Sequence, residues 1–347
     1  MNKISKRKGE RLLVVGPSWV GDMVMTQSLL KLLRRQHPDA SITVMAPSWC
    51  RALTDRMPEV DCGIESPFSH GELSLGKRWK FGRQLSGQYD VAYVLPNSFK
   101  SALVPFFGGI RRRIGWQGEL RDLLLTDCRK LDKKQYPRMV ERFVALGSDP
   151  GEPLPDYDLP KLVTDSQQAE HVAARLGVTI NGQVLAVCPG AEFGDAKQWP
   201  LEHYAKLCDL AVSSGWQIWI LGSPNDREAG SQVLSAVAES NRSHCFNLTG
   251  RTSLTEAIDL LSLASATVTN DSGLMHIAAA VGSPLVALYG SSSHYFTPPL
   301  AERVKSLSTN IDCRPCFKRQ CPLGHKRCLT EIAPVEVFES LRDLLLS

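Results

Sequence analysis

The stretch RLLVVGPSWVGDMVM, Arg11–Met25, joins an apolar run to a turn and to the beginning of a helical pattern. Arg11–Val15 has the composition of a short buried strand. From residue 23 to residue 35 apolar side chains recur at helical spacing, and the pattern stops before His37-Pro38. A strand that passes through a tight turn into a helix is typical of a βαβ unit. The stretch therefore predicts an α/β fold with a parallel sheet.

The turn in this stretch stands where a nucleotide-binding fold often places its phosphate loop. It does not have the G-x-G-x-x-G spacing, and the sequence contains no G-x-x-x-x-G-K-[ST] motif. Both absences count against an NAD enzyme and against a P-loop ATPase. The turn carries instead an acidic residue, Asp22, which read alone is either a helix cap or a functional carboxylate.

Outward from this stretch, strand and helix patterns alternate through two halves of the chain. Further strands are expected at Ser41–Met45, Val91–Leu95, Arg112–Gly115, Val184–Val187, Gln217–Leu221, Cys245–Leu248, Ala266–Thr269 and Leu285–Leu288. Helices are expected at Leu201–Ser213, Leu254–Ala264 and Pro334–Leu346. Residues 147–160 are rich in proline and glycine and read as a linker. The pattern predicts two doubly wound, Rossmann-like domains that bind ligands at the carboxyl ends of their strands.

Composition is that of an ordinary globular protein, with 347 residues and a net charge of +4. Basic residues gather in the first half, at 3–11, at 77–83 and at Arg111, Arg112 and Arg113. Such clusters are either solvated surface or a face that meets phosphates or an anionic membrane. The mild net charge does not argue for nucleic acid. With no long apolar run and no signal-peptide pattern, a cytoplasmic protein is expected.

Four of the ten cysteines cluster near the C-terminus, with His325 among them. Cys313, Cys316, Cys321 and Cys328 have the spacing C-x2-C-x4-C-x6-C. The spacing falls short of the usual paired zinc knuckles, so a structural zinc, redox-labile thiols and plain packing all stay open. A catalytic metal is not expected.

Three strand-end turns of the second half are candidates for binding an anionic ligand. TNDSGLMHIAAA, residues 269–280, leads from a strand into an alanine-rich helix whose free N–H groups suit a diphosphate, although Asp271 or Ser272 could simply cap it. CPGAEFGDAKQWP, residues 188–200, offers the cation Lys197. In the third turn, residues 221–228, an acidic side chain could accept ribose hydroxyls or begin a helix.

Taken together, these segments resemble the ADP-heptose:lipopolysaccharide heptosyltransferases, glycosyltransferase family 9. The matching blocks are GPSWVGDMVM, VMAPSWC, YVLPNSFKSALVPFF, CPGAEFGDAKQWP, TNDSGLMHIAAA, LVALYG and FTPPL, which span about residues 16–300 in the family's order. GPSWVGD with NSFKSALVPFF is closer to the second heptosyltransferase of the inner core than to the first.

The resemblance implies a GT-B fold, with two Rossmann-like domains facing a central cleft, and an inverting, metal-independent transfer of heptose. It places an acceptor domain at 1–155, an ADP-heptose domain at 156–333 and, at 334–347, a helix that packs back on the N-terminal domain. The implied acceptor is of the heptosyl-Kdo2-lipid A type, which would bring the protein into peripheral contact with the inner membrane.

Residue by residue, the resemblance makes Asp22 the general base. It implies donor contacts by Gly190, Ala191, Lys197, Asp226, Asp271, Ser272, Gly273 and His276, with Asp226 the weaker match. Acceptor contacts would come from Ser18, Trp19, Asn97, Ser98, Lys100, Arg111, Arg112 and Arg113. Other readings are the first heptosyltransferase, a nucleotide-sugar 2-epimerase of the same architecture, and a non-catalytic nucleotide-binding or membrane-associated scaffold.

Overall fold

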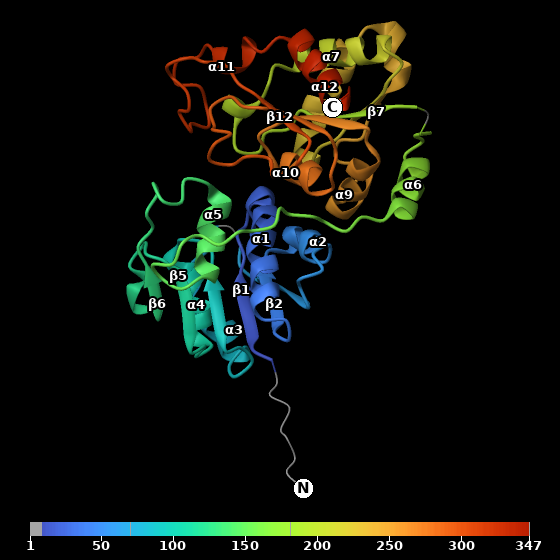
Figure 1. The fold of residues 1–347 in the computed structure, drawn as a ribbon. Helices are drawn as coiled ribbons and strands as arrows, with labels where there is room; N and C mark the ends of the chain where they lie inside the picture. Colours follow the sequence, from blue (N-terminus) through green and yellow to red (C-terminus); the bar gives the residue numbers. More distant parts are fainter. Residues whose placement is uncertain (1–8, 70, 181, 347) are drawn as a thin grey trace. The chain divides into compact units, whose positions relative to one another are not determined.

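The computed structural model describes residues 9–69, 71–180 and 182–346, which form two compact units (Figure 1). The first unit ends at Pro160 and the second begins at Lys161. The boundary expected from the sequence, at residue 155, lies within the same proline-rich segment. Of the N-terminal basic cluster, residues 3–8 lie outside the described residues.

The first unit is built on a six-stranded parallel sheet with the strand order β3-β2-β1-β4-β5-β6. Its strands are β1 (Arg11–Val15), β2 (Ser41–Ala46), β3 (Cys62–Glu65), β4 (Val91–Val94), β5 (Arg112–Trp116) and β6 (Asp127–Arg129). Its α-helices are α1 (Val20–Gln36), α2 (Arg51–Thr54), α3 (Leu75–Gln84), α4 (Phe99–Phe107) and α5 (Met139–Val144). The central strands are apolar and buried, as a sheet covered by helices on both faces requires.

The second unit repeats this plan with a second parallel sheet, in the order β12-β11-β10-β7-β8-β9. The strands are β7 (Val184–Cys188), β8 (Gln217–Ile220), β9 (Cys245–Asn247), β10 (Ala266–Asn270), β11 (Leu285–Leu288) and β12 (Val304–Leu307). The α-helices are α6 (Ser166–Arg175), α7 (Leu201–Ser213), α8 (Arg227–Ala236), α9 (Leu254–Leu263), α10 (Gly273–Ala280), α11 (Arg327–Thr330) and α12 (Pro334–Leu346).

In each sheet the first strand in sequence lies at the centre. β1 pairs with β2 on one side and β4 on the other, and β7 pairs with β8 and β10. The chain therefore winds outward in both directions from that strand, and a crevice opens beyond the carboxyl ends of the two central neighbours. The predicted doubly wound α/β class is confirmed in both units.

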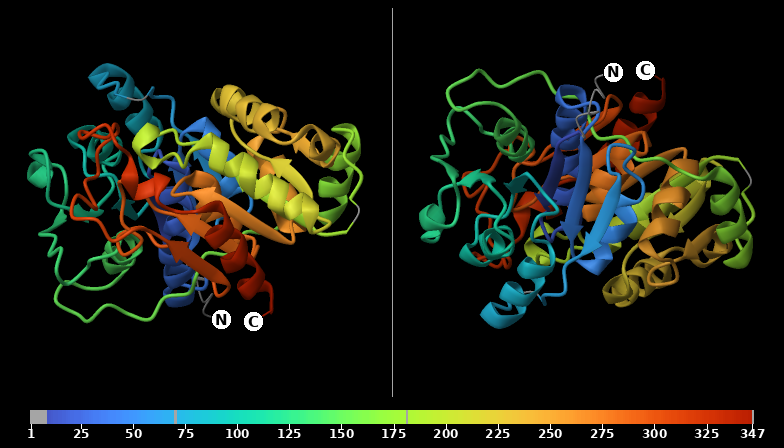
Figure 2. Two further views of the ribbon diagram at one scale, coloured as in Figure 1. Left: turned by 90° about the horizontal axis from the view of Figure 1, so that it is seen from above. Right: turned by 90° about the horizontal axis from the view of Figure 1, so that it is seen from below.

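The C-terminal helix α12 differs from its prediction. It was expected to pack on the N-terminal domain, but its buried residues Val337, Phe338 and Leu341 belong to the core of the second unit. The helix packs on α7, on β11 and on the edge strand β12, and Figure 2 shows it beside the last strands of the second sheet. Its apolar stripe satisfies that sheet's need for cover, so this helix completes the second unit.

Candidate functional site

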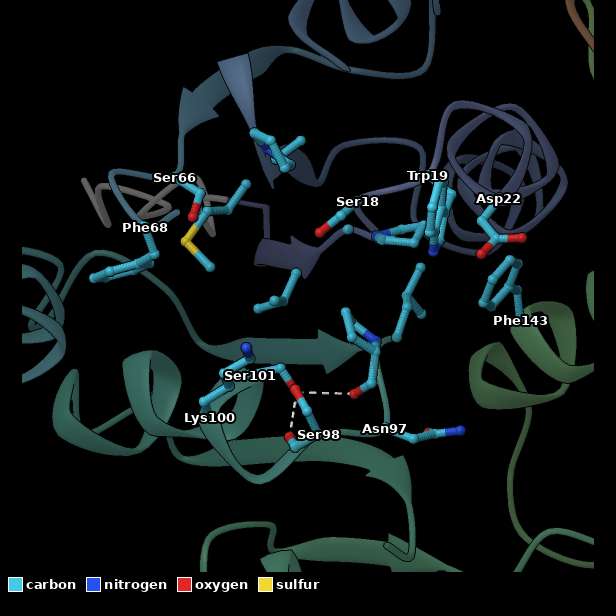
Figure 3. A pocket seen from close by; sticks show the side chains of 18 of the residues that line it. Ser18, Trp19, Asp22, Ser66, Phe68, Asn97, Ser98, Lys100, Ser101 and Phe143 are labelled. Carbon is cyan, nitrogen blue, oxygen red and sulfur yellow. Dashed lines mark hydrogen bonds between the residues drawn. The ribbon is translucent and has the colours of Figure 1, made fainter. Parts of the chain in front are cut away.

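A pocket of about 460 Å³ opens in the first unit, where β1 and β4 end side by side. The turn after β1, the segment after β4 and the loop after β3 supply most of its walls (Figure 3). Of the first-unit residues predicted to bind or act on the acceptor, Ser18, Trp19, Asp22, Asn97, Ser98 and Lys100 line it. Side chains from segments about eighty residues apart thus share one pocket because parallel strands end at a common edge.

Asp22 lies in the first turn of α1, and among the described residues that line the pocket it is the one carboxylate. Figure 3 shows it near Trp19 and Phe143, at the opposite end of the view from Ser66 and Phe68. Trp19 precedes the helix and provides no side-chain cap, so Asp22 is not the N-cap residue that its position alone allowed. Burial, with a smaller contribution from the charge of Asp22, raises the pKa of the Cys50 thiol to about 12. Cys50 therefore stays protonated at neutral pH.

The β4 side of the pocket is fixed by hydrogen bonds beneath its surface. The hydroxyl of Ser101 lies 2.8 Å from the carbonyl oxygen of Pro96 and 2.6 Å from that of Ser98 (Figure 3). The fully buried Arg121 donates to the same Pro96 oxygen and to the carbonyl of Trp116. Burial lowers the pKa of Arg121 to about 10, which leaves it charged at neutral pH. These bonds hold the turn that presents Asn97 and Ser98.

Aromatic side chains line much of the same pocket. Trp19 and Trp49 are both about half exposed, at 45% and 48%, and Phe68, Trp116 and Phe143 complete the apolar walls. The indole N–H of Trp49 donates to the carbonyl of Ser18 over 2.9 Å, which ties the tryptophan to the turn after β1. A pocket that combines aromatic walls with polar and charged side chains is typical of a site for a small organic ligand.

The three consecutive arginines predicted to contact the acceptor do not line this pocket. Arg112 and Arg113 pair in register with Val91 and Ala92, at the amino end of β4, whereas the pocket lies at its carboxyl end. The guanidinium of Arg112 lies 3.6 Å from Asp127, and that of Arg113 donates to the carbonyl of Leu124 over 2.6 Å.

Arg111 immediately precedes β5, the strand on which Arg112 and Arg113 lie. The three arginines therefore lie at the amino end of the strands, away from the pocket. Two other arginines line the pocket instead. Arg78 belongs to the basic cluster at 77–83, whereas no sequence pattern indicated Arg142.

In the second unit the predicted donor residues follow the three adjacent strands β10, β7 and β8. Asn270, the last residue of β10, connects the turn after β10 to the turn after β7 by hydrogen bonds. Its amide nitrogen donates to the carbonyls of Pro189 and Gly190 over 2.9 and 3.2 Å. Its side-chain oxygen accepts a hydrogen bond from the backbone N–H of Trp199 over 2.9 Å. The sequence did not indicate this role of Asn270. Asn270 is completely buried, and a buried amide needs hydrogen-bond partners, which these turns supply.

Lys197 and Asp271 form an ion pair at this edge of the sheet. The ammonium of Lys197 lies 2.6 Å from a carboxylate oxygen of Asp271, and Asp271 is only 5% exposed. The ammonium also lies 5.0 Å from the ring centre of Phe193. The aspartate therefore holds the lysine in place beside the start of α10, and a ligand that meets this ammonium finds it already positioned.

Ser272 is the N-cap residue of α10, which begins at Gly273, and its side chain makes no capping hydrogen bond to the helix. The first backbone N–H groups of a helix have no partner within it, so this end offers donors and a partial positive charge to an anion. His276 lies one turn further along the helix and is buried. Burial lowers the pKa of His276 to about 4, with the opposing effect of Asp271 exceeding the added lowering by Lys197. The imidazole is therefore neutral at pH 7.

Asp226 lies in the turn after β8, and its side chain extends toward the turn after β7. Its carboxylate accepts hydrogen bonds from the backbone N–H and the hydroxyl of Ser223, both at 2.7 Å. A Cβ atom added at Gly190 would lie 2.4 Å from the Asp226 carboxylate, so this approach requires glycine. Ala191 follows in the same turn. All eight predicted donor residues thus lie in the turns after β7, β8 and β10 or at the start of α10.

The tail cysteines give no support to a zinc site. Cys313, Cys316, Cys321 and Cys328 are all free thiols, and they line a narrow space of about 20 Å³. Within the described ranges, no group of three or more histidine, cysteine or acidic side chains is arranged to hold a metal ion.

Comparison with known proteins identifies a family. The model of glycosyltransferase family 9 (heptosyltransferase) matches residues 78–327. The lipopolysaccharide heptosyltransferase 2 of Escherichia coli K12 is 46% identical over 97% of this chain and 99% of its own. The lipooligosaccharide heptosyltransferase 2 of Haemophilus influenzae is 45% identical over 96% of this chain and 99% of its own.

A solved structure supports the same assignment. The E. coli ADP-heptose lps heptosyltransferase II superposes on this chain with a TM-score of 0.88 at 44% identity, covering 97% of this chain and 98% of that one. The likeness extends over both units, so it bears out the predicted pair of Rossmann-like domains as well as the sequence blocks that carried the resemblance.

Proposed function

This chain belongs to glycosyltransferase family 9, the heptosyltransferases, and we propose that it transfers L-glycero-D-manno-heptose from ADP-heptose to the first heptose of the lipopolysaccharide inner core. The observation that carries the proposal is near-full-length similarity, at 45–46% identity, to proteins named heptosyltransferase 2. It favours the second heptosyltransferase over the first and over an epimerase.

The donor is proposed to bind in the second unit. The diphosphate of ADP-heptose needs positive charge and N–H donors, and Lys197 and the uncapped start of α10 supply them. Charge builds on this diphosphate as the sugar–oxygen bond breaks, so the same groups stabilise the leaving ADP. Asp226 is proposed to accept hydrogen bonds from the ribose hydroxyls. One of its carboxylate oxygens accepts from Ser223, and the other lies beside Gly190 in the turn after β7.

The acceptor is proposed to bind in the pocket of the first unit. Aromatic faces at Trp19 and Trp49 suit the apolar face of a sugar ring, and Asn97, Ser98 and Lys100 offer polar groups to hydroxyls and acidic substituents. The proposed site does not include Arg111–Arg113, because they lie at the other end of the strands.

Asp22 is proposed as the general base. It takes the proton from the acceptor hydroxyl, whose oxygen attacks the anomeric carbon of the donor from the face opposite the diphosphate. A carbon–oxygen bond forms to the acceptor, the bond to the diphosphate breaks, and ADP leaves with the electron pair. The configuration at the anomeric carbon is inverted. Charge on the leaving group is met by Lys197 and α10, so the proposed chemistry requires no metal.

The location that we propose for the protein follows from its proposed acceptor. None of the helices in the described part of the chain is long and apolar enough to cross a membrane. A lipid-anchored acceptor nevertheless holds its sugars at the bilayer surface. We therefore propose a peripheral protein at the cytoplasmic face of the inner membrane.

The direct experiment supplies purified protein with ADP-heptose and a core acceptor that carries a single heptose, and measures release of ADP and the mass of the product. One added heptose on the acceptor, with full turnover in the presence of a chelator, is expected. Turnover only with an acceptor that lacks heptose would instead identify the first transferase. Isomerisation of the nucleotide sugar without consumption of acceptor would identify an epimerase.

A further inference from the structure

Helix α3 of the first unit, labelled in Figure 1, has one packed face and one exposed face. The packed face meets α4 so closely that a Cβ added at Gly82 would lie 2.7 Å from the carbonyl oxygen of Val104. On the opposite side Leu75, Trp79 and Arg83 are spaced four residues apart and share one exposed stripe, with Lys80 beside them.

This stripe combines large apolar side chains with positive charge. Leu75 is 50% and Trp79 55% exposed, and Leu73, just before the helix, is 47% exposed. The helix itself contains no acidic residue, and the one carboxylate directly before it, Glu72, is paired with Lys77 at 2.8 Å. We name Leu73, Leu75, Trp79, Lys80 and Arg83 the α3 face.

Arg78, another basic residue of the helix, has a different role. Its guanidinium donates to the carbonyls of Leu73, Glu72 and Lys100, and it lies 3.9 Å from the ring centre of Phe68. It is buried and ties α3 to the first turn of α4 and to the loop before it. Because Lys77 is paired with Glu72, the net positive charge on the exposed side of the helix comes from Lys80 and Arg83.

We propose that the α3 face docks on an anionic lipid bilayer. A short amphipathic helix with tryptophan and leucine between lysine and arginine fits the boundary between lipid headgroups and acyl chains. The indole and the leucines enter the interface, while the basic side chains meet lipid phosphates. A purely polyanionic partner would match the cations alone and would leave three half-exposed apolar side chains unused.

The position of the α3 face supports this choice. The segment that leads into α3 forms one end of the acceptor pocket, through Ser66, Phe68 and Gly71, and Arg78 of the helix lines it as well. A bilayer that contacts the face would lie next to the pocket in which we propose that a lipid-anchored sugar binds. The purpose of such a contact rests on the proposed function, but binding of the α3 face to a bilayer can be measured without any acceptor.

The experiment uses the full chain and sedimentation with vesicles. Wild-type protein is expected to bind vesicles of phosphatidylethanolamine and phosphatidylglycerol, to bind pure phosphatidylcholine far more weakly, and to be released by salt. Lys80→Glu with Arg83→Glu should weaken binding about tenfold or more, and Leu75→Ser with Trp79→Ser should weaken it as well. The matched control variants are Lys133→Glu with Lys134→Glu, on an exposed loop of the same unit, and Val335→Ser, 53% exposed on α12.

Equal loss in the control variants, or binding by wild type and by both α3 variants alike, would overturn the proposal. So would failure of the wild type to bind anionic vesicles, the result expected if the α3 face serves a protein partner. A second measurement locates the contact: brominated lipids should quench the fluorescence of wild type, and Trp79→Phe should bind yet lose most of that quenching. Undiminished quenching in Trp79→Phe would place the contact elsewhere.

Activity separates this proposal from the proposed function. With a water-soluble acceptor, the Lys80→Glu and Arg83→Glu variant should turn over like wild type, while with acceptor in vesicles its apparent acceptor KM should rise. If wild type transfers no heptose to either acceptor, the proposed function fails, and the vesicle binding experiment still decides the docking surface. An equal loss of turnover on the soluble acceptor would show that the variant damages the pocket and would contradict a docking role.

Discussion

The two units share a fold but present opposite chemistry at equivalent places. Each has its site beyond the central strands of a doubly wound sheet, after β1 and β4 in the first unit and after β7 and β10 in the second. The first offers an open pocket with aromatic walls and a carboxylate, Asp22. The second offers closely bonded turns, with an ion pair and an uncapped helix.

The difference supports the proposal that one architecture carries out two tasks. In both units the sheet fixes where the turns lie, and the residues after the strands determine what they can bind. The turn after β1 carries a carboxylate, which would repel a diphosphate, and the turn after β7 and the start of α10 carry a lysine and free N–H groups, which attract one. The following predictions test this division of work.

The largest effect is expected for Asp22→Asn. The amide keeps the shape of the side chain but cannot take a proton, so kcat should fall about 10³-fold. The KM for ADP-heptose should stay within about twofold. Initial rates of ADP release at varied donor and acceptor concentrations measure both. A kcat close to that of wild type would remove Asp22 from the chemistry.

Lys197→Met should lower kcat/KM for the donor about 10²-fold, because the leaving diphosphate loses a cation. It also leaves the carboxylate of Asp271 buried without its partner, which destabilises the fold. The double variant Lys197→Met with Asp271→Asn is the control. It should recover stability toward urea without recovering donor use. Full recovery of activity in the double variant would show that the pair is only structural.

The burial of His276 predicts that the second unit becomes less stable in acid. Its pKa is about 4 in the folded protein against 6.5 for the free side chain, so the unfolded chain binds the extra proton between these values. The neutral imidazole therefore stabilises the folded state fully above pH 6.5. As the pH falls from 6.5 toward 4, the free energy of unfolding decreases by a total of about 3 kcal/mol. Urea titrations at pH 7 and pH 4.5 should therefore show a smaller pH effect in His276→Gln. Identical pH effects would contradict the burial of an uncharged imidazole.

Gly190→Ala should act on the donor side alone. The added methyl would lie 2.4 Å from the Asp226 carboxylate, which must then move. The KM for ADP-heptose should rise about tenfold because a displaced contact loses its geometry. The acceptor KM should be unchanged. Gly76→Ala, where an added Cβ meets nothing within 4 Å, is the control and should match wild type in both constants.

The smallest effect is expected for Trp49→Phe in the first unit. The ring face is kept, while the hydrogen bond to the carbonyl of Ser18 is lost. With a water-soluble acceptor the acceptor KM should rise about threefold, near the value of one hydrogen bond. Trp79→Phe, at a similarly exposed position of α3, should have no effect in this assay. A change in donor KM would show that Trp49 serves the other substrate.

Much of the fold could be predicted from the sequence because the buried central strands are nearly continuous apolar runs. Arg11–Val15 and Val184–Cys188 are examples, and each leads directly into a turn. Strands at or near the sheet edges were harder. β3 (Cys62–Glu65) and β12 (Val304–Leu307) were not predicted, since both are short and only partly buried, and their sequences carry little apolar signal.

The sites divide in a similar way. Asp22, Lys197 and the start of α10 could be proposed from the sequence because strand-end turns carry visible polar residues, and the resemblance added the roles proposed for them. The arginine cluster at 111–113 does not line the pocket, and the sequence could not show this because charge along the chain does not tell which end of a strand a side chain lies near. Arg121 and Asn270 were missed because their importance lies in buried hydrogen bonds between segments distant in sequence. The path of α12 was likewise fixed by tertiary packing.

Calorimetric titration of ADP into two variants tests the division of work most directly. The account predicts that Asp22→Asn binds ADP with the affinity of wild type, whereas Lys197→Met, folded by circular dichroism, binds it at least about tenfold more weakly. Loss of ADP affinity in Asp22→Asn, with affinity retained in Lys197→Met, would contradict the assignment of acceptor chemistry to the first unit and donor binding to the second.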